Sequence, residues 1–474
     1  MKKPKLTAEL FTFPHNGKHV IYAPFRHVMV LGNEATVNLL ADIKNGTFRK
    51  TGTDEEKKTL KILREKGIID GEPEKHPVSP NSQEFHPTAV TLFPTNQCNM
   101  SCIYCYASAG EARPKNMPWT MAKAAIDIIA ENARKLNQNR FSVGFHGGGE
   151  PTLPWSFFTK CVEYSKELGE KIGKKVTCSV ATNLVFTSKQ VEWIIKNMDS
   201  LSISLDGTPD IQNIQRPLAN GKESYDIVAN NIKILDEAKF NYGLRSTITK
   251  FNVLRLKEIV SLFLDEFNPR SIQFEPLFLC GRCQTTNVEA PDAKVFIREF
   301  LKANKLAEKK KMKLAYSGLR LGGVTSTFCG ACGSNFCVTP EGNVTSCFEV
   351  VEKDDPRSQL FFYGIWKAKE KKYEFWEDKR QHLASFNAAN IPYCADCIAK
   401  WHCAGDCLAK VSYTSDVEGD RGSERCWMNQ EITKRKIKQM FKKPPKSQSF
   451  EKLILSEDID IAKNIKVREK YHVK

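Results

Sequence analysis

Long apolar runs are missing from this sequence of 474 residues. No stretch approaches the roughly 18 consecutive apolar residues of a transmembrane helix, so we expect no membrane-spanning segment and no membrane partner. The first residues, MKKPKLTAELFTFP, lack the apolar core of a secretory signal peptide. With 41% hydrophobic residues, the chain can nevertheless bury a sizeable core. The sequence therefore predicts a folded cytoplasmic protein.

Acidic side chains are in the minority, 55 against 71 basic ones, which gives a formal net charge of +16. Such an excess suits an acidic partner, including nucleic acid. Much of it lies in residues 305–313 and 434–446, and no recognised nucleic-acid-binding motif accompanies it. We therefore favour solvated basic faces over a nucleic-acid-binding role.

Cysteine, in contrast, is abundant, with 16 residues. In a reducing compartment this number argues for metal or cluster ligation over disulfides. Three thiols, Cys98, Cys102 and Cys105, follow an apolar run over 89–93 that predicts a β-strand. They lie in the segment PTNQCNMSCIYCY, which is therefore a loop at the carboxyl end of that strand.

Three cysteines can hold three irons of a cubane cluster and leave the fourth iron open to a small molecule. A zinc site is the alternative for this segment. Zinc normally takes four ligands, however, and no fourth Cys or His lies nearby in the sequence. The spacing therefore favours an iron–sulfur cluster with a chemical role.

Strands and amphipathic helices alternate from Thr88 onwards. Strands are predicted over 88–93, 141–146, 176–181, 200–205, 243–249 and 271–276, and helices over 119–136, 155–170, 187–198, 225–239, 253–267 and 291–311. Six βα units in series predict an α/β fold, with a parallel sheet curled into part of a barrel. In such barrels the loops at the carboxyl ends of the strands carry the chemistry, and the three-cysteine loop obeys that rule.

A second group of thiols lies in the C-terminal half, at Cys329, Cys332, Cys337, Cys347, Cys394, Cys397, Cys403, Cys407 and Cys426. This number of thiols suits either iron–sulfur clusters or two zinc ions. A further pair, Cys280 and Cys283, follows the sixth predicted strand. It indicates a redox pair, half a metal site or two free thiols.

The C-x3-C-x2-C spacing, with Tyr104 before the last cysteine, resembles that of the radical SAM enzymes. The resemblance implies a partial (β/α)6 TIM barrel. It also implies a catalytic [4Fe-4S] cluster on Cys98, Cys102 and Cys105, whose open iron chelates S-adenosylmethionine. An electron from the cluster then cleaves the sulfonium and gives a 5′-deoxyadenosyl radical. Tyr104 is expected to lie at the cofactor.

Three further loops at the same end of the predicted barrel carry motifs similar to those of this superfamily. The segment HGGGEPT resembles the GGEP motif, and its glycines and carboxylate suit the amine of S-adenosylmethionine. The segment ATNLV resembles TNG, except that Leu184 replaces the glycine, and SISLDGTPDIQNIQR resembles the SLDG segment with its downstream Arg. Asp206 in that segment is either a site residue or a turn residue. The cofactor-binding residues implied are Gly148, Gly149, Glu150, Asn183, Ser204 and Arg216.

The C-terminal cysteine pattern resembles the SPASM domain, which binds two auxiliary [4Fe-4S] clusters. By that resemblance Cys394, Cys397, Cys403 and Cys426 hold one cluster. Cys329, Cys347 and Cys407 hold the other, with Cys332 or Cys337 as a candidate fourth ligand. Two zinc ions remain the alternative, and the radical SAM loop upstream favours three iron–sulfur clusters in total.

The N-terminal residues predict a β-hairpin over 19–31 and two helices. Asn33 is the expected N-cap of the first, over 34–45, and Thr53 with Glu56 forms a capping box for the second, which ends at Gly67. This α+β unit resembles the winged-helix peptide-recognition element that is fused to peptide-modifying radical enzymes, and a purely structural N-terminal cap is the alternative. We divide the chain into this domain (1–72), a polar linker (73–87), the barrel (88–312), the SPASM domain (313–432) and a basic tail (433–474).

The architecture implies a radical SAM/SPASM maturase that oxidises a ribosomally made precursor peptide containing Cys and forms a thioether crosslink. A reductant such as flavodoxin or ferredoxin is the expected electron donor. The first alternative is a sulfatase-maturing type of enzyme that oxidises a protein Cys or Ser. That branch has an Asp directly after the cysteine that ends the first SPASM segment, whereas Phe348 follows Cys347 here and the nearest carboxylate is Glu349. The second alternative is a non-catalytic zinc protein that binds nucleic acid.

Overall fold

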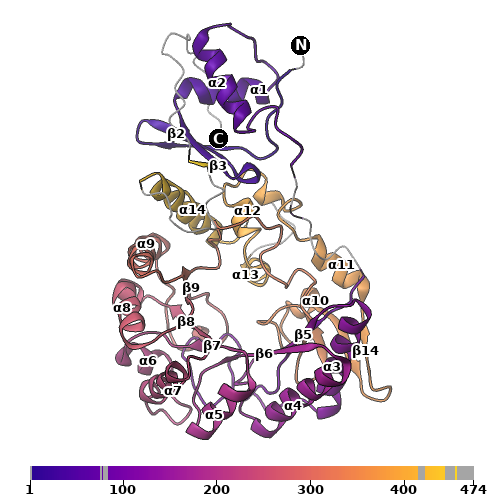
Figure 1. The fold of residues 1–474 in the computed structure, drawn as a ribbon. Helices are drawn as coiled ribbons and strands as arrows, with labels where there is room; N and C mark the ends of the chain where they lie inside the picture. Colours follow the sequence, from indigo (N-terminus) through magenta and orange to yellow (C-terminus); the bar gives the residue numbers. More distant parts are fainter. Residues whose placement is uncertain (1–2, 75–76, 78–83, 415–421, 443–453, 456–474) are drawn as a thin grey trace.

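The computed structural model describes residues 3–74, 77, 84–414, 422–442 and 454–455. In the described part, a small sheet of four strands belongs to the N-terminal unit, and a large sheet of eleven strands runs through the rest of the molecule. Figure 1 shows the N-terminal unit at one end of the molecule and the curved large sheet at the other, with α12–α14 between them.

The barrel strands are β4 (Ala89–Leu92), β5 (Arg140–Phe145), β6 (Lys175–Thr182), β7 (Ser200–Ser204), β8 (Tyr242–Ile248) and β9 (Ile272–Pro276). They pair in parallel and in sequence order, and the short β10 (Leu314–Ala315) extends the sheet beyond β9. All six predicted strands are confirmed, and they form the large parallel sheet expected of the fold.

Helices cover the outer side of this sheet, as Figure 1 shows. They are α3 (Trp119–Lys135), α4 (Trp155–Ile172), α5 (Ser188–Asn197), α6 (Pro209–Gln215), α7 (Tyr225–Glu237), α8 (Leu256–Glu266) and α9 (Ala293–Lys309). Strand residues such as Val143 and Ile203 pack against helix residues such as Ile126 and Ile232 in one continuous apolar core. The six predicted helices are confirmed, and the short α6 was not predicted.

The C-terminal cysteine-rich segment continues the barrel sheet. Strand β11 (Cys337–Val338) pairs in parallel with β4, and β12 (Asn343–Thr345), β13 (Phe362–Lys367) and β14 (Lys372–Phe375) follow in antiparallel order. The remaining helices of this half are α10 (Ser358–Phe361), α11 (Glu377–Ser385), α12 (Lys400–Cys403), α13 (Leu408–Thr414) and α14 (Arg425–Lys442). The barrel and the cysteine-rich segment therefore share one sheet. Helix α14 also runs through the predicted border between residues 432 and 433.

The N-terminal unit contains β1 (Phe11–His15), β2 (Lys18–Ala23), β3 (Val28–Gly32), α1 (Glu34–Lys44) and α2 (Asp54–Glu65). The predicted hairpin corresponds to β2 and β3, and β1 adds a strand that was not predicted. The side chain of Asn33 caps α1 and that of Thr53 caps α2, as expected. Glu56 completes no capping box, because its carboxylate accepts from the backbone N–H and the hydroxyl of Thr51. The winged-helix assignment stays a prediction.

Part of the predicted tail returns to this N-terminal sheet. Strand β15 (Ile454–Leu455) pairs in parallel with β3. The other residues predicted for the tail beyond 442 lie outside the described part of the chain.

One face of the N-terminal sheet packs on α12 and α14. Phe13 and Met29 share an apolar cluster with Ile437 and Met440. Lys400 pairs with Glu9 at 2.8 Å, the Tyr22 hydroxyl hydrogen-bonds to His402, and the Phe25 ring lies 4.7 Å from that of Trp401. The N-terminal unit thus rests directly on the segment between Cys397 and Cys403.

Within the described ranges, none of the helices combines the length and hydropathy that a lipid bilayer crossing requires.

We expect the contact of Phe25 with Trp401 to contribute measurably to stability. Phe25→Ala removes half-buried ring area and an aromatic contact, and should lower the free energy of unfolding by about 2 kcal/mol. Phe251→Ala is the matched control, because the Phe251 side chain is 49% exposed. That change should alter stability by less than about 0.5 kcal/mol. Urea denaturation of both variants measures the difference, and equal effects would contradict the described docking.

Candidate functional site

The loop after β4 places Cys98, Cys102 and Cys105 at the carboxyl end of the barrel, as predicted. Burial raises the pKa of the Cys98 thiol to about 12 and that of Cys102 to about 11. Buried thiols with such raised pKa values stay protonated at pH 7 unless a nearby positive charge stabilises the thiolate. Binding of metal as a thiolate complex would supply that charge and release the protons. The three side chains therefore fit the ligation of a metal cluster.

Gly149 brings the loop after β5 against the cysteine loop. A Cβ at this position would lie 2.2 Å from the backbone oxygen of Gln97, so only glycine fits. The next residue, Glu150, donates its N–H to the same oxygen at 2.9 Å. A Cβ at Gly148 would meet no atom closer than 3.6 Å. The predicted glycine motif thus allows a close approach of two backbones, in addition to any contact with a ligand.

Glu150 is buried, and its carboxylate accepts four hydrogen bonds from its own chain. They come from the N–H and hydroxyl of Thr152, the hydroxyl of Thr182 and the N–H of Asn183, at 2.7–3.2 Å. Burial raises the pKa of Glu150, and these hydrogen bonds oppose the shift. One carboxylate oxygen accepts only the bond from Asn183, so it keeps capacity for a cationic ligand.

Asn183 lies beside the first thiol of the loop. Its side-chain amide donates to Asn99 at 2.7 Å and approaches the Cys98 sulfur at 3.8 Å. The following residue, Leu184, has φ of 58°, the left-handed conformation that glycine adopts without strain. Leu184 therefore adopts the backbone conformation expected of the glycine in the TNG pattern, and its side chain is buried.

Arg216, Tyr104 and Asp206 form one buried network. The Tyr104 hydroxyl donates to Asp206 at 2.6 Å, and Arg216 donates to the same hydroxyl at 2.9 Å. The N–H of Thr247 also donates to Asp206, which connects the network to β8. Asp206 is thus a buried anchor of the cysteine loop, and Ser204 lies half-buried at the end of β7.

The C-terminal thiols form two groups. Cys329, Cys332, Cys347 and Cys407 form the first, in which the pKa of each is raised by burial. The Cys329 and Cys407 thiols raise the pKa of Cys332 and of Cys347 further, so these four lie near one another. Cys337 lies in β11, where its thiol hydrogen-bonds to Thr91 and packs against Phe93 and Val351, and of the other thiols only Cys329 raises its pKa.

The second group surrounds one small cavity, which is lined by Cys394, Cys397, Cys403 and Cys426. The Asn429 amide donates to the Cys403 sulfur at 3.2 Å. Burial raises the pKa of all four thiols, in the case of Cys426 to about 11. These are the four residues that the resemblance assigned to one cluster.

In the described ranges, no three His, Cys, Asp or Glu side chains converge as closely as the ligands of a single metal ion do. The choice between zinc ions and iron–sulfur clusters for these two groups therefore rests on the cysteine pattern of the sequence.

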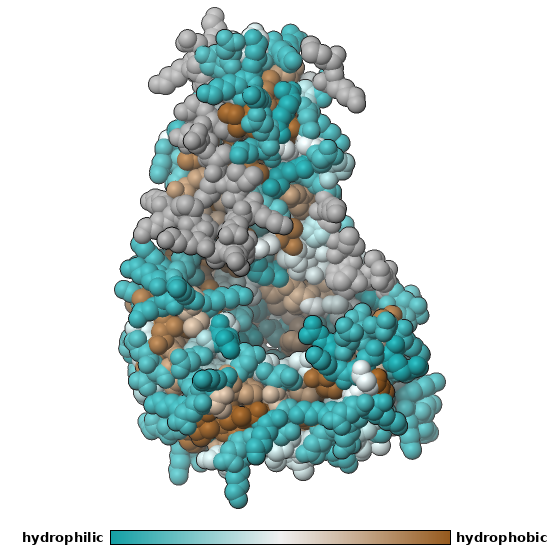
Figure 2. Space-filling model, in the orientation of Figure 1, coloured by the Kyte–Doolittle hydropathy of each residue, from teal (hydrophilic) through white to brown (hydrophobic). Residues whose placement is uncertain are grey.

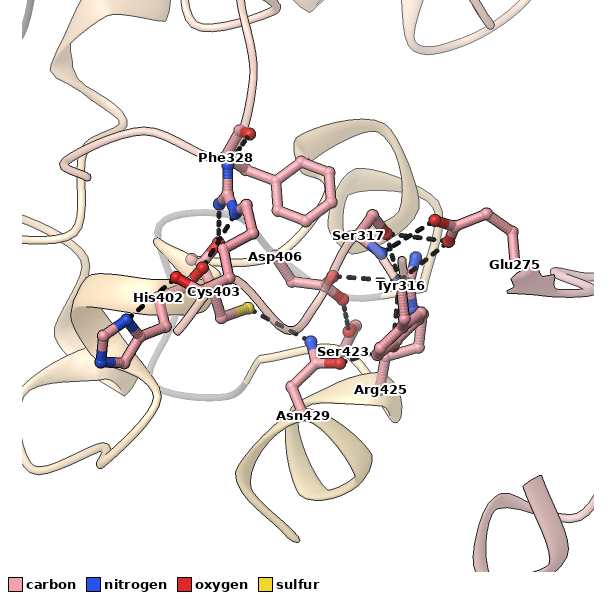
Figure 3. A network of polar contacts seen from close by, with 12 residues as sticks. Glu275, Tyr316, Ser317, Phe328, His402, Cys403, Asp406, Ser423, Arg425 and Asn429 are labelled. Carbon is pink, nitrogen blue, oxygen red and sulfur yellow. Dashed lines mark hydrogen bonds and ion pairs between the residues drawn. The ribbon is translucent and has the colours of Figure 1, made fainter. Parts of the chain in front are cut away.

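Arginines that the sequence reasoning missed hold these loops to the barrel, as Figure 3 shows. Arg320 donates to the carbonyl oxygens of His402, Cys403 and Phe328, and so joins the loops of both thiol groups. Arg425 is buried between Glu275 at the end of β9, at 4.0 Å, and Asp406, at 3.5 Å. Nothing in the sequence pattern distinguished these two from other basic residues.

Glu349 lies where the barrel faces the first C-terminal thiol group. Its N–H donates to the Cys347 sulfur at 3.4 Å, and one carboxylate oxygen, Oε2, is buried without a hydrogen-bond partner in the described structure. Tyr106 of the cysteine loop donates to the backbone oxygens of Gly147 and Phe348. Tyr106 therefore connects the two thiol-bearing regions, and Figure 2 shows the molecule hollowed above the barrel helices.

His146 lines the same region. Burial, together with the charge of Arg245, lowers the pKa of His146 to about 4, so the ring is neutral at pH 7. Its Nδ1 accepts from the N–H of Gly147, and the Phe348 ring stacks on it with ring centroids 4.8 Å apart. The region thus combines the carboxylate of Glu349 with a neutral His146, the Phe348 ring and the nearby charge of Arg245.

This barrel, with three thiols on its first loop, defines a class of protein. Residues 92–263 match the family model of the Radical SAM superfamily. The chain therefore contains a radical SAM domain, and its loop residues fit the iron–sulfur cluster and S-adenosylmethionine of that superfamily.

Two curated relatives each match somewhat more than a third of the chain. An uncharacterized protein of Methanocaldococcus jannaschii, MJ0907, is 32% identical over 39% of this chain and 60% of its own length. A cysteine-type anaerobic sulfatase-maturating enzyme of Clostridium novyi is 28% identical over 38% of this chain and 49% of its own length. The chain thus spans about half the length of the relatives that it matches.

Two solved structures share the fold over most of the chain. Native anSMEcpe with bound AdoMet has a TM-score of 0.57 and 17% identity, covering 75% of this chain and 98% of that one. SuiB of Streptococcus suis bound to precursor peptide SuiA has a TM-score of 0.52 and 13% identity, covering 89% and 99%. The Clostridium novyi relative is thus named as a maturating enzyme, and the SuiB structure contains a bound precursor peptide.

Gly149 should be essential for the cysteine loop. Gly149→Ala would place a methyl group against the Gln97 backbone oxygen and displace the loop. We expect this variant to lose the iron bound by the first three cysteines, measured as iron per chain after anaerobic reconstitution. Gly148→Ala is the matched control, since its methyl group has ordinary contacts, and should retain that iron. Equal iron contents in the two variants would contradict the proposed contact.

Proposed function

We propose that this protein is a radical SAM maturase that oxidises a ribosomally made, Cys-containing precursor peptide and forms a thioether crosslink. One observation carries the proposal: a group of four thiols and the unpaired Glu349 carboxylate lie beside the loop of Cys98, Cys102 and Cys105, and Tyr106 contacts both regions. A substrate held there would reach both thiol sites.

We further propose the ligands of three [4Fe-4S] clusters. Cys98, Cys102 and Cys105 hold the first, which leaves one iron open to S-adenosylmethionine. Cys329, Cys332, Cys347 and Cys407 hold the second, and Cys394, Cys397, Cys403 and Cys426 hold the third. Both Cys329 and Cys407 raise the pKa of Cys332, whereas only Cys329 raises that of Cys337, and this difference supports Cys332 as the fourth ligand of the second group.

When bound, the first cluster and S-adenosylmethionine supply a 5′-deoxyadenosyl radical that removes a hydrogen atom from the substrate. The residues of this chain orient the reactants. Gly149 and Glu150 hold the cysteine loop in place, and Asn183 lies beside Cys98. Ser204 and Arg216 lie on the same side of the barrel. We propose that these residues, with Gly148 and Tyr104, surround the cofactor.

Glu349 is the proposed base. A thioether requires the substrate thiol to lose its proton and a substrate carbon to lose a hydrogen atom, and an auxiliary cluster held by the neighbouring thiols would accept the remaining electron. The Oε2 atom of Glu349 has no hydrogen-bond partner in the described structure, and the charge of this carboxylate raises the pKa of the Cys347 thiol, so we propose that it accepts the thiol proton. The neutral His146 ring stacks on Phe348, the residue before Glu349.

The sulfatase-maturing reaction is the second candidate, because the Clostridium novyi relative and anSMEcpe belong to that branch. The N-terminal unit that rests on α12 favours a peptide substrate with a separate recognition segment, as does the similarity to SuiB with its precursor peptide. An electron donor such as flavodoxin or ferredoxin is part of this proposal. A zinc-dependent nucleic-acid binder fits less well, because residues 92–263 match the Radical SAM superfamily.

The test is anaerobic incubation with S-adenosylmethionine, a reductant and the peptide encoded beside the gene, followed by mass spectrometry. The wild type should give a peptide lighter by two hydrogens with its thiol protected from alkylation. Glu349→Gln should still release 5′-deoxyadenosine but lower the yield of this product at least tenfold, because the thiol keeps its proton. A product with a free thiol and an added carbonyl would indicate the sulfatase type of oxidation instead.

Cys332 and Cys337 allow a matched comparison of the second cluster. Cys332→Ala should remove iron and the absorbance of one cluster, because it deletes a ligand. Cys337→Ala should retain the iron and lower stability by about 1–2 kcal/mol, because it deletes a buried contact in β11. Iron analysis and urea denaturation of both variants check this assignment, and the reverse pattern would move the ligand to Cys337.

A further inference from the structure

The loop after β9 carries the sequence Cys280-Gly281-Arg282-Cys283, which the proposed reaction leaves without a role. The structure places it in a short 3-10 helix, Gly281–Gln284, against the first cysteine loop. The two thiols are free, and the Cys283 sulfur donates to the Cys280 carbonyl oxygen. The contacts with the cysteine loop come from the two residues between the thiols and from Thr286.

Gly281 allows the close approach. It has φ of +63°, and a Cβ here would lie 2.5 Å from the carbonyl oxygen of Cys105 and 2.4 Å from that of Tyr106. The N–H of Arg282 donates to the Cys105 oxygen at 2.9 Å. Glycine is therefore required for a backbone that lies directly on the last cysteine of the loop.

The guanidinium group of Arg282 binds three further acceptors in the cysteine loop. It donates to the carbonyl oxygens of Cys102 at 3.0 Å and Ala109 at 2.6 Å, and it pairs with Glu111 at 2.5 Å. These three acceptors span ten residues of one loop, and the Arg282 side chain is only 10% exposed. Three acceptors in different directions suit the planar fork of arginine, and lysine cannot reproduce that geometry.

Thr286 adds a contact from the next turn. Its hydroxyl donates to the carbonyl oxygen of Ile103 at 2.6 Å. Carbonyl oxygens of Cys102, Ile103, Cys105 and Ala109 are thus all held by the segment 281–286. The cysteine loop contains no regular helix or strand, so these bonds supply much of its fixed shape.

We propose that Arg282 is a positioning residue for the first cluster, which fixes the shape of the cysteine loop and holds a buried positive charge beside its ligands. The inference rests on the proposed use of Cys98, Cys102 and Cys105 as cluster ligands. Reduction adds a negative charge to a cluster, and a nearby buried cation stabilises the reduced form. Hydrogen bonds and charges around the ligands are known to change the reduction potential of a cluster. Arg282 thus eases the reduction that must precede cleavage of S-adenosylmethionine.

The test compares Arg282→Gln, Arg282→Lys and the control Arg255→Gln in the reconstituted full-length protein. Arg255 is likewise an ion-paired arginine on a barrel loop, with Asp210 and Glu258 as partners, but it makes no contact with the cysteine loop. The first cluster is followed in a redox titration by the part of the EPR signal that changes when S-adenosylmethionine is added. Amide hydrogen exchange of residues 98–111 reports the order of the loop.

Arg282→Gln should lower the ratio of reduced to oxidised first cluster about tenfold at a fixed potential, which is about 59 mV for a one-electron couple. It should also speed exchange in residues 98–111. Arg282→Lys should restore most of the reduction potential, because the positive charge remains. Amide exchange in residues 98–111 should stay fast in this variant, because lysine lacks the planar guanidinium group. Arg255→Gln should match the wild type in both measurements.

An unchanged potential together with unchanged exchange in Arg282→Gln would overturn the proposal. If that variant holds no first cluster, Thr286→Val provides the second test, since it removes the hydroxyl's hydrogen bonds to the Ile103 and Arg282 carbonyl oxygens and no charge. This variant should speed amide hydrogen exchange in residues 98–111 and leave the reduction potential of the first cluster at the wild-type value. Unchanged amide exchange would equally overturn the positioning role. Neither measurement needs a peptide product, so failure of the proposed crosslinking reaction would be seen separately.

Discussion

Thiols whose burial outweighs the nearby positive charges are the constraint on which this structure depends. Burial raises the pKa of Cys98, Cys347 and Cys403, and no surrounding cation reverses these shifts. Thiolates at these positions become stable only when metal supplies positive charge, so cluster binding and the ordered state of the loops are linked. The cysteine-rich half shows why this matters, since its helices α10, α12 and α13 have only four to seven residues. Such short elements gain little stability from their own hydrogen bonds.

The loops that carry the thiols are held mainly through their backbone oxygens. The backbone oxygen of Gln97 is contacted by Gly149 and accepts a hydrogen bond from Glu150. The backbone oxygen of Cys105 is contacted by Gly281, and Arg282 donates hydrogen bonds to the oxygens of Cys105 and Cys102. In the second half, Arg320 binds the oxygens of Cys403 and Phe328 in the same manner. This arrangement leaves the thiol side chains free for ligation. It also ties loops from different parts of the chain into one unit.

The period of apolar residues was sufficient to predict the barrel, because its strands and helices are amphipathic over their whole length. The position of the first cysteine loop followed from its place after an apolar strand. Pairing between distant segments could not be predicted in this way. Cys337 and Cys332 look alike in sequence, and only the pairing of β11 with β4 separates them. Arg282, Arg425 and Glu349 were missed as site residues for a similar reason, since their partners lie far away in the chain. The unpaired oxygen of Glu349 and the φ of Leu184 become visible only in three dimensions.

The pairing of β11 with β4 has a consequence for how the protein is made. Strand β4, which leads into the first cysteine loop, is flanked by β5 on one side and by a strand more than two hundred residues later on the other. Until that later strand has emerged from the ribosome, β4 is an open edge whose free N–H and C=O groups invite pairing with foreign chains. The barrel segment therefore completes its sheet only after the cysteine-rich half has been synthesised, and a shortened chain ending before β11 would expose an aggregation-prone border.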